Sequence, residues 1–226
     1  MKKFLIKNLI VPVLSILLVS SVYAADEFSV YNTKYPAKFT ADYIDNLKPV
    51  YRKVSKDEVV IVALDMLKGT NGEFSRKAIL GNNLTGEPVK VEFKKLSEMG
   101  KEYSDFDALG WKKGKKLYIF INQKHKVAPP GALAALLAHE ALHQDEFNSL
   151  AEETYAWTME ASVWCEILRI FPESADDNRN ALVARENTLK KLFERGKYSD
   201  KYIKKTVWSN DGYKNLPTTS PGFEDL

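Results

Sequence analysis

Hydrophobic and polar positions alternate over residues 89–93, which is typical of a half-buried strand. A continuous apolar run at 117–121 predicts a second, more buried strand. Upstream of both, a capping-box pattern at 55–58 precedes apolar positions that suit a helix ending at Gly69. Residues 70–88 are rich in Gly and Asn, so they are predicted to form turns and loops.

Helices are predicted to make up most of the C-terminal half. Two consecutive prolines precede a predicted helix over 131–147, and a second helix spans about 150–170 before Pro172 ends it. Ser174 and Ser199 are the predicted N-caps of a third and a fourth helix. Together these patterns predict an α+β domain that is rich in helices and has a small sheet.

Residues 1–24 are predicted to be a secretory signal peptide. Three lysines accompany an apolar stretch at 9–19 that is too short to span a bilayer comfortably. Small residues at Val22 and Ala24 predict cleavage after Ala24, with the following alanine as a nearby alternative. Because no cysteine lies at this site, we expect no lipid anchor. The protein is expected to be exported, to the periplasm or the medium, with no membrane anchor after cleavage.

The rest of the chain divides into three predicted parts. Residues 25–54 show weak periodicity and are interpreted as an N-terminal arm, residues 55–210 as one domain, and residues 211–226 as a tail on its surface. The three lysines of the leader account for the whole formal charge of +3, so the mature chain is neutral. A neutral chain argues against nucleic acid or anionic lipid as a partner. Cys165 is the single cysteine, which excludes an intramolecular disulfide.

Residues 139–143 read His-Glu-Ala-Leu-His, a pattern in which two histidines lie one helical turn apart. Both imidazoles can then bind one zinc ion, while Glu140 between them can act as general base on a water. Apolar residues surround the motif on every side, which indicates a buried helix. Since two imidazoles and a carboxylate are costly to bury unless something satisfies them, we expect one Zn²⁺ per chain, held by His139 and His143.

A zinc site of this kind needs a third protein ligand, and the next predicted helix carries the candidates. At roughly 100° per residue, Glu153 and Glu160 lie on an aromatic stripe together with Trp157. Glu152 lies nearer the edge of that stripe and could complete a capping box with Ser149. Glu153 is therefore the predicted third ligand and Glu152 the alternate. Glu160 is a candidate partner for a histidine N–H, or a carboxylate at the edge of the interface.

These residues resemble the gluzincin branch of the zincin metallopeptidases. The resemblance rests on His139, Glu140 and His143, followed on the next predicted helix by Glu153, Thr154, Tyr155 and Ala156. It implies a zincin-like domain over 55–210 with an HExxH active-site helix, peptidase activity, and Glu153 as a zinc ligand. It also implies an edge strand that pairs with an extended substrate, for which 117–121 is the candidate. Gluzincins commonly carry an acid four residues after the ligand glutamate, where this chain has Trp157.

Other residues are weaker candidates. His125, Tyr155 and Tyr118 could donate a hydrogen bond to a substrate carbonyl or an oxyanion, although packing or surface roles are commoner for such residues. Arg185 could hold a carboxylate of the site. Cys165 has apolar neighbours and is interpreted as a small buried residue.

The sequence thus predicts a zinc-dependent hydrolase that cleaves amide bonds in a peptide, a protein or a cell-wall peptide. The alternative is a non-catalytic exported protein in which the same residues bind zinc structurally, or in which an inactive scaffold binds a partner. Because structural zinc sites are closed by four protein ligands, a fourth ligand such as His125 would favour that alternative.

Overall fold

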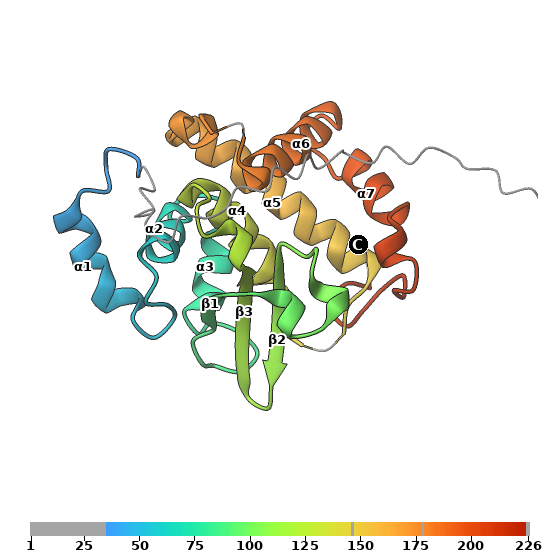
Figure 1. The fold of residues 1–226 in the computed structure, drawn as a ribbon. Helices are drawn as coiled ribbons and strands as arrows, with labels where there is room; N and C mark the ends of the chain where they lie inside the picture. Colours follow the sequence, from blue (N-terminus) through green and yellow to red (C-terminus); the bar gives the residue numbers. More distant parts are fainter. Residues whose placement is uncertain (1–34, 146, 178, 225–226) are drawn as a thin grey trace, which may run out of the picture. The chain divides into compact units, whose positions relative to one another are not determined.

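The computed structural model describes residues 35–145, 147–177 and 179–224 (Figure 1). These residues belong to one compact unit. The predicted signal peptide and residues 25–34 of the predicted arm lie outside them. Within the described ranges, seven α-helices and one three-stranded sheet agree with the predicted helix-rich α+β class. No helix among them has the length and apolar content that crossing a bilayer demands.

The sheet has the order β1-β3-β2, so β3 is its central strand. Its strands are β1 (Lys90–Lys94), β2 (Ala108–Lys113) and β3 (Lys116–Asn122). β1 runs parallel to β3, and β2 runs antiparallel to it. The prediction of strands at 89–93 and 117–121 is confirmed, but the expectation that 117–121 forms an edge strand is wrong. The two edge strands are β1 and β2, and the sequence of β2 shows no clear alternation because most of its residues are partly or fully exposed.

The interpretation of residues 25–54 as an arm is wrong for its second half, which contains the helix α1 (Ala41–Tyr51). Thr40 caps this helix by accepting the N–H of Tyr43, and the buried Ile44, Leu47 and Tyr51 pack against the next helix. Only three of the eleven residues of α1 are buried, which leaves a weak periodic signal, but tertiary packing is sufficient to stabilise the helix.

The next two helices also differ from prediction. α2 (Glu58–Met66) begins later than the capping box at 55–58 implies, because the hydroxyl of Ser55 accepts the N–H of Asp57 and forms a local turn instead. Gly69 follows α2 with a φ of +72°, a conformation that glycine adopts without strain. The predicted loop over 70–88 contains α3 (Glu73–Ile79), a short helix that buries Ala78 and Ile79.

The centre of the domain is α4 (Pro130–Glu140), all of whose residues are buried, packed against α2 and against α5 (Leu150–Ile170). Ser149 caps α5 as predicted, accepting the N–H of Glu152. The helix predicted over 131–147, however, ends at Glu140. The N–H groups of Leu142 and His143 bond three residues back, to His139 and Glu140, which is the tightened geometry of a final 3₁₀ turn.

Two further helices, α6 (Ala181–Arg195) and α7 (Lys201–Trp208), cover the other side of α5. Asn180 caps α6, so the prediction of Ser174 as the N-cap is wrong: Ser174 lies in a short 3₁₀ turn that follows α5. Asp200 occupies the N-cap position of α7, one residue after the predicted Ser199. The segment after α7 folds back and forms backbone hydrogen bonds with the start of α5 (Figure 1).

Candidate metal centre

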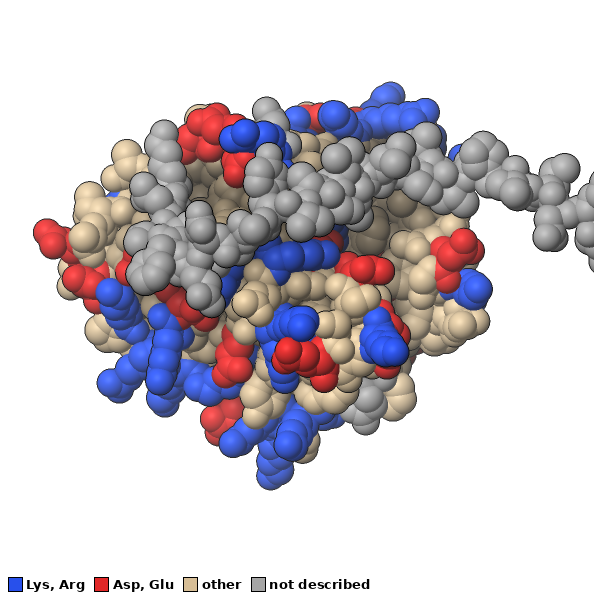
Figure 2. All heavy atoms as spheres, in the orientation of Figure 1, with Lys and Arg blue, Asp and Glu red and all other residues tan. Residues whose placement is uncertain are grey.

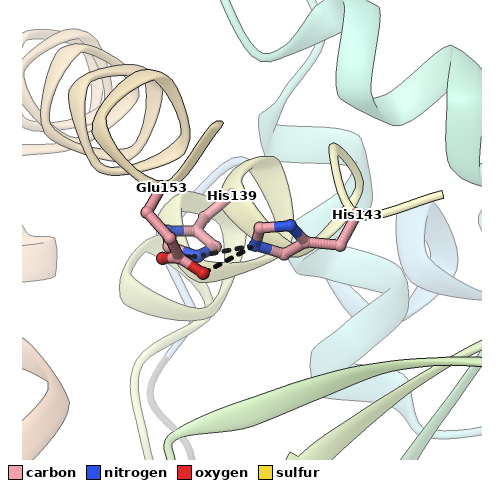
Figure 3. A group of neighbouring side chains, drawn as sticks. All are labelled: His139, His143 and Glu153. Atoms are coloured by element: carbon pink, nitrogen blue, oxygen red, sulfur yellow. Dashed lines mark hydrogen bonds and ion pairs between the residues drawn. The ribbon is translucent and has the colours of Figure 1, made fainter. Parts of the chain in front are cut away.

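His139, His143 and Glu153 converge on one point at the end of α4 (Figure 3). The Nε2 atoms of the two histidines are 3.2 Å apart. Oε2 of Glu153 lies 3.9 Å from Nε2 of His139, and Oε1 of Glu153 lies 3.8 Å from Nε2 of His143. Two ligands about 2.0–2.1 Å from a tetrahedral zinc are about 3.3 Å apart, close to the spacing of the two nitrogens. The cluster therefore has the donor types and the approximate spacing of a zinc site.

His143 reaches this point although it lies beyond the end of the α-helix. The tightened turn after Glu140 keeps its side chain on the same side as His139, and β2 supports it from outside. A Cβ atom at Gly110 of β2 would lie 3.1 Å from the Cβ of His143, which is closer than side chains normally approach. Glycine at this position therefore lets the strand pack directly against the second histidine.

Each imidazole is oriented by a carboxylate on α5. Nδ1 of His139 lies 3.0 Å from Oε2 of Glu160, and Nδ1 of His143 lies 2.9 Å from Oε1 of Glu152. When Nδ1 donates its proton to a carboxylate, Nε2 keeps a lone pair for a metal. The carboxylate of Glu152 therefore lies on the outer side of His143, away from the three converging atoms. It does not complete a capping box either, because its other oxygen accepts the hydroxyl of Ser220.

Charges in this buried site shift the pKa of its groups. Burial alone would lower the pKa of His143, but the hydrogen bond to Glu152 and the charges of Glu153 and Glu140 outweigh it and raise the pKa to about 9. Burial would raise the pKa of Glu153, yet the neighbouring His139 and His143 lower it. The site thus gathers negative charge, which would stabilise a cation at its centre.

Glu153 itself provides a test of whether the residues fit a metal. Asn148 donates a hydrogen bond of 2.6 Å to Oε1 of Glu153, whereas Oε2 is buried and has no hydrogen-bond partner within the described part of the chain. An unsatisfied buried carboxylate oxygen costs free energy, and a cation shared with the two histidines removes that cost. Two imidazoles and one carboxylate form one of the donor sets found in catalytic zinc sites.

A second set of charged residues supports Glu160 from behind. Arg185 of α6 bonds both oxygens of Glu160, and its Nε lies 3.3 Å from Oδ2 of Asp107, the residue before β2. Burial would raise the pKa of Glu160, but Arg185 and then His139 outweigh it and lower the pKa to about 2. Glu160 therefore stays ionised, and Arg185 connects it to the start of the edge strand.

The weaker candidates lie elsewhere. His125 is buried, and its Nε2 is 2.7 Å from Oδ1 of Asp107, so it belongs to the Arg185 network rather than to the converging ligands. Tyr155 is 40% exposed and packs against Phe223, while Tyr118 stacks on Phe120. Neither tyrosine lines the cleft described next.

A cleft of about 800 Å³ opens over the three converging side chains. Its walls come from β2, from the chain around Asp145 and Phe147, and from the segment after α7. Glu140 lines its floor, and burial raises the pKa of this carboxyl group despite the nearby histidines. A polar group that the sequence did not suggest also lies here, because Tyr213 lines the cleft beside Glu153.

Burial and then the charge of Glu153 raise the pKa of Tyr213, so its phenol stays protonated and can donate a hydrogen bond. No local pattern points to this tyrosine, since it ends a short 3₁₀ turn, Asp211–Tyr213, 60 residues after Glu153. Only the return of the chain along α5 brings it to the site.

Comparison with protein-family models, with curated proteins and with solved structures finds no match to this chain.

Proposed function

We propose that this protein is an exported zinc-dependent metallopeptidase that hydrolyses amide bonds in peptides. The observation that carries the proposal is the convergence of His139, His143 and Glu153 beneath a cleft whose floor also holds Glu140. The described residues bring three ligands together rather than four, which is the arrangement of catalytic zinc sites and not of structural ones. The leader-like residues 1–24 support the proposal of export to the periplasm or the medium.

Bound zinc would polarise a substrate carbonyl and lower the pKa of a water molecule. Glu140 takes a proton from the attacking water and passes it to the amide nitrogen as the C–N bond breaks, which yields a carboxylic acid and an amine. Its raised pKa suits this exchange, since a general base works best when its pKa approaches the working pH. Tyr213 donates a hydrogen bond to the charge that develops on the carbonyl oxygen.

The edge strand β2 supports binding of an extended peptide. The N–H of Asn122 bonds the carbonyl of Asp107, so alternate residues from Asp107 onward direct their backbone groups toward β3. Ala108 and Gly110 consequently direct theirs toward the open side of the sheet, where the cleft lies. Main-chain hydrogen bonds to such an edge bind a peptide without depending on its sequence. This role belongs to β2 in place of the strand at 117–121.

Metal content is the first test. We expect one zinc per chain in the purified protein by elemental analysis, and loss of zinc in both His143→Ala and Glu153→Ala, because each substitution removes one of three ligands. Glu98→Ala, which changes an exposed glutamate that pairs with Lys95, is the matched control and keeps its zinc. A wild-type protein that takes up no zinc after reconstitution would refute the proposal.

Glu140→Gln separates catalysis from metal binding. This variant should keep one zinc per chain and lose at least about a hundredfold of peptide hydrolysis, since it retains the shape of the site but cannot accept a proton. Zinc retained together with full activity would show that Glu140 is not the general base.

A further inference from the structure

Four lysines gather at the turn of the β2–β3 hairpin, which reads Lys112-Lys113-Gly114-Lys115-Lys116. All five residues are exposed, and Gly114 makes the tight turn with a φ of +60°. Lysine and arginine side chains gather at the lower edge of Figure 2, where the same hairpin ends in Figure 1. The hairpin is thus a local concentration of positive charge on a chain whose mature form is predicted to be neutral.

This arrangement of lysines carries an electrostatic cost. Lys113 and Lys116 lie directly opposite each other in the antiparallel pair, where like charges destabilise a hairpin. Lys113, Lys115 and Lys116 form no ion pair within the described part of the chain that would offset this repulsion. An anionic ligand at the hairpin would relieve it.

The hairpin also borders the cleft. Lys112 and Gly114 line the same cleft as His139, His143 and Glu140. Within β2, Gly110 packs against His143, and Lys113 ends the strand at the turn. A peptide that binds along the open edge of β2 therefore extends from the metal centre to the lysines. We propose that this hairpin selects peptide substrates that carry acidic side chains on the side of the scissile bond that lies along it. The inference rests on the proposed peptidase function and names its substrate class.

The distance from Gly110 to the turn determines which substrate positions lie close to the lysines. A strand rises about 3.3 Å per residue, so Lys113 lies about 10 Å along the strand from Gly110. An acidic side chain three or four residues from the scissile bond then lies level with the turn. Because the lysines are exposed, dissolved salt screens their attraction for such a side chain, so selection by charge is stronger at low salt than at high salt.

The test compares two peptides that differ only in carrying three glutamates or three lysines at the third to fifth positions from the scissile bond. Two such pairs are made, one with the charged residues before the scissile bond and one with them after it. In one set, the wild-type enzyme is expected to cleave the acidic peptide with a kcat/KM at least about tenfold higher at low salt, and less than about threefold higher in 0.5 M NaCl. Equal cleavage of acidic and basic peptides in both sets would overturn the inference and leave the peptidase function standing.

The variant Lys113→Ser/Lys115→Ser/Lys116→Ser should lose the preference while cleaving an uncharged peptide at the wild-type rate. The control Lys191→Ser/Lys201→Ser/Lys205→Ser removes the same charge from exposed lysines of α6 and α7, which do not line the cleft, and should keep the preference. If the control variant loses the preference for the acidic peptide as fully as the hairpin variant does, the inference is also overturned. Should the lysines merely protect the sheet edge from aggregation, the hairpin variant scatters light while the wild type shows no salt-dependent preference.

Binding distinguishes failure of the inference from failure of the proposed function. Zinc-loaded Glu140→Gln protein is titrated into fluorescein-labelled acidic and basic peptides, with anisotropy as the readout. Tighter binding of the acidic peptide at low salt supports the inference even when the wild type hydrolyses no peptide. Equal affinity for the two peptides refutes it whatever the wild type hydrolyses.

Discussion

The carboxylates around the two histidines have two different roles: one is a candidate metal ligand, and the others hold the imidazoles in place. Nε2 of each imidazole faces Glu153, while each Nδ1 faces a different carboxylate of α5. Arg185 holds Glu160 in turn, because its guanidinium donates to both carboxylate oxygens and so fixes the orientation of that carboxylate. The orientation of His139 therefore depends on a residue that does not touch the proposed metal.

Glu160→Gln tests this dependence at the residue scale. The amide keeps the size of the side chain but removes the charge that stabilises the Nδ1 proton of His139, so zinc affinity should fall by about tenfold to a hundredfold. Competition with a chromophoric chelator measures that affinity, and Glu98→Gln provides an exposed control. An affinity within twofold of the wild-type value would show that Glu160 has only a packing role.

At the scale of elements, the site depends on the close approach of β2 to the turn that follows α4. α4 ends in a tightened turn that keeps the side chain of His143 on the same side as that of His139, while the Cβ of His143 lies next to Gly110. Gly110 leaves room for it, and the same strand forms a wall of the cleft. An edge strand that both supports a ligand and offers its backbone to a peptide links substrate binding to the geometry of the metal centre.

Gly110→Ala is expected to disturb this link. The new methyl group would meet the Cβ of His143 at 3.1 Å, so one of the two elements must shift by a few tenths of an ångström and zinc affinity should fall by about tenfold. Gly114→Ala is the control. It strains a turn with positive φ and should cost about 1 kcal/mol of stability, but it meets no neighbouring atom and should leave zinc affinity unchanged. Equal zinc affinity in the two variants would contradict a role for Gly110 in positioning His143.

On the scale of the whole molecule, segments distant in sequence complete the site. The N–H groups of Leu150 and Ala151 at the first turn of α5 have no partner within the helix, and they donate to the carbonyls of Pro217 and Thr218. Ser220 then reaches both Ser149 and Glu152. The predicted tail at 211–226 thus provides, over its described residues, a wall of the cleft and a brace for the start of α5.

Ser220→Ala measures the contribution of this brace. It removes a 2.8 Å hydrogen bond to the buried carboxylate of Glu152, so the free energy of unfolding should fall by about 1–3 kcal/mol and zinc affinity by several-fold. Ser209→Ala, which changes an exposed serine whose hydroxyl donates to the carbonyl of Thr206 in α7, should change neither quantity. Denaturant unfolding and chelator competition report the two effects separately. Unchanged zinc affinity in Ser220→Ala would show that the segment does not act on His143 through Glu152.

The sequence by itself determined the features that depend on local periodicity. The buried character of α4 and the cap and phase of α5 follow from helical spacing over short stretches, and that phase also predicted Glu153 as the partner of the two histidines. Tertiary structure alone decided the rest. The edge position of β2, the contact of Glu152 with His143, and the return of Tyr213 to the cleft depend on contacts between residues far apart in the chain. The hydrophobic pattern of a segment reports which of its faces is buried but not what covers that face, so these partners had no signal in the sequence.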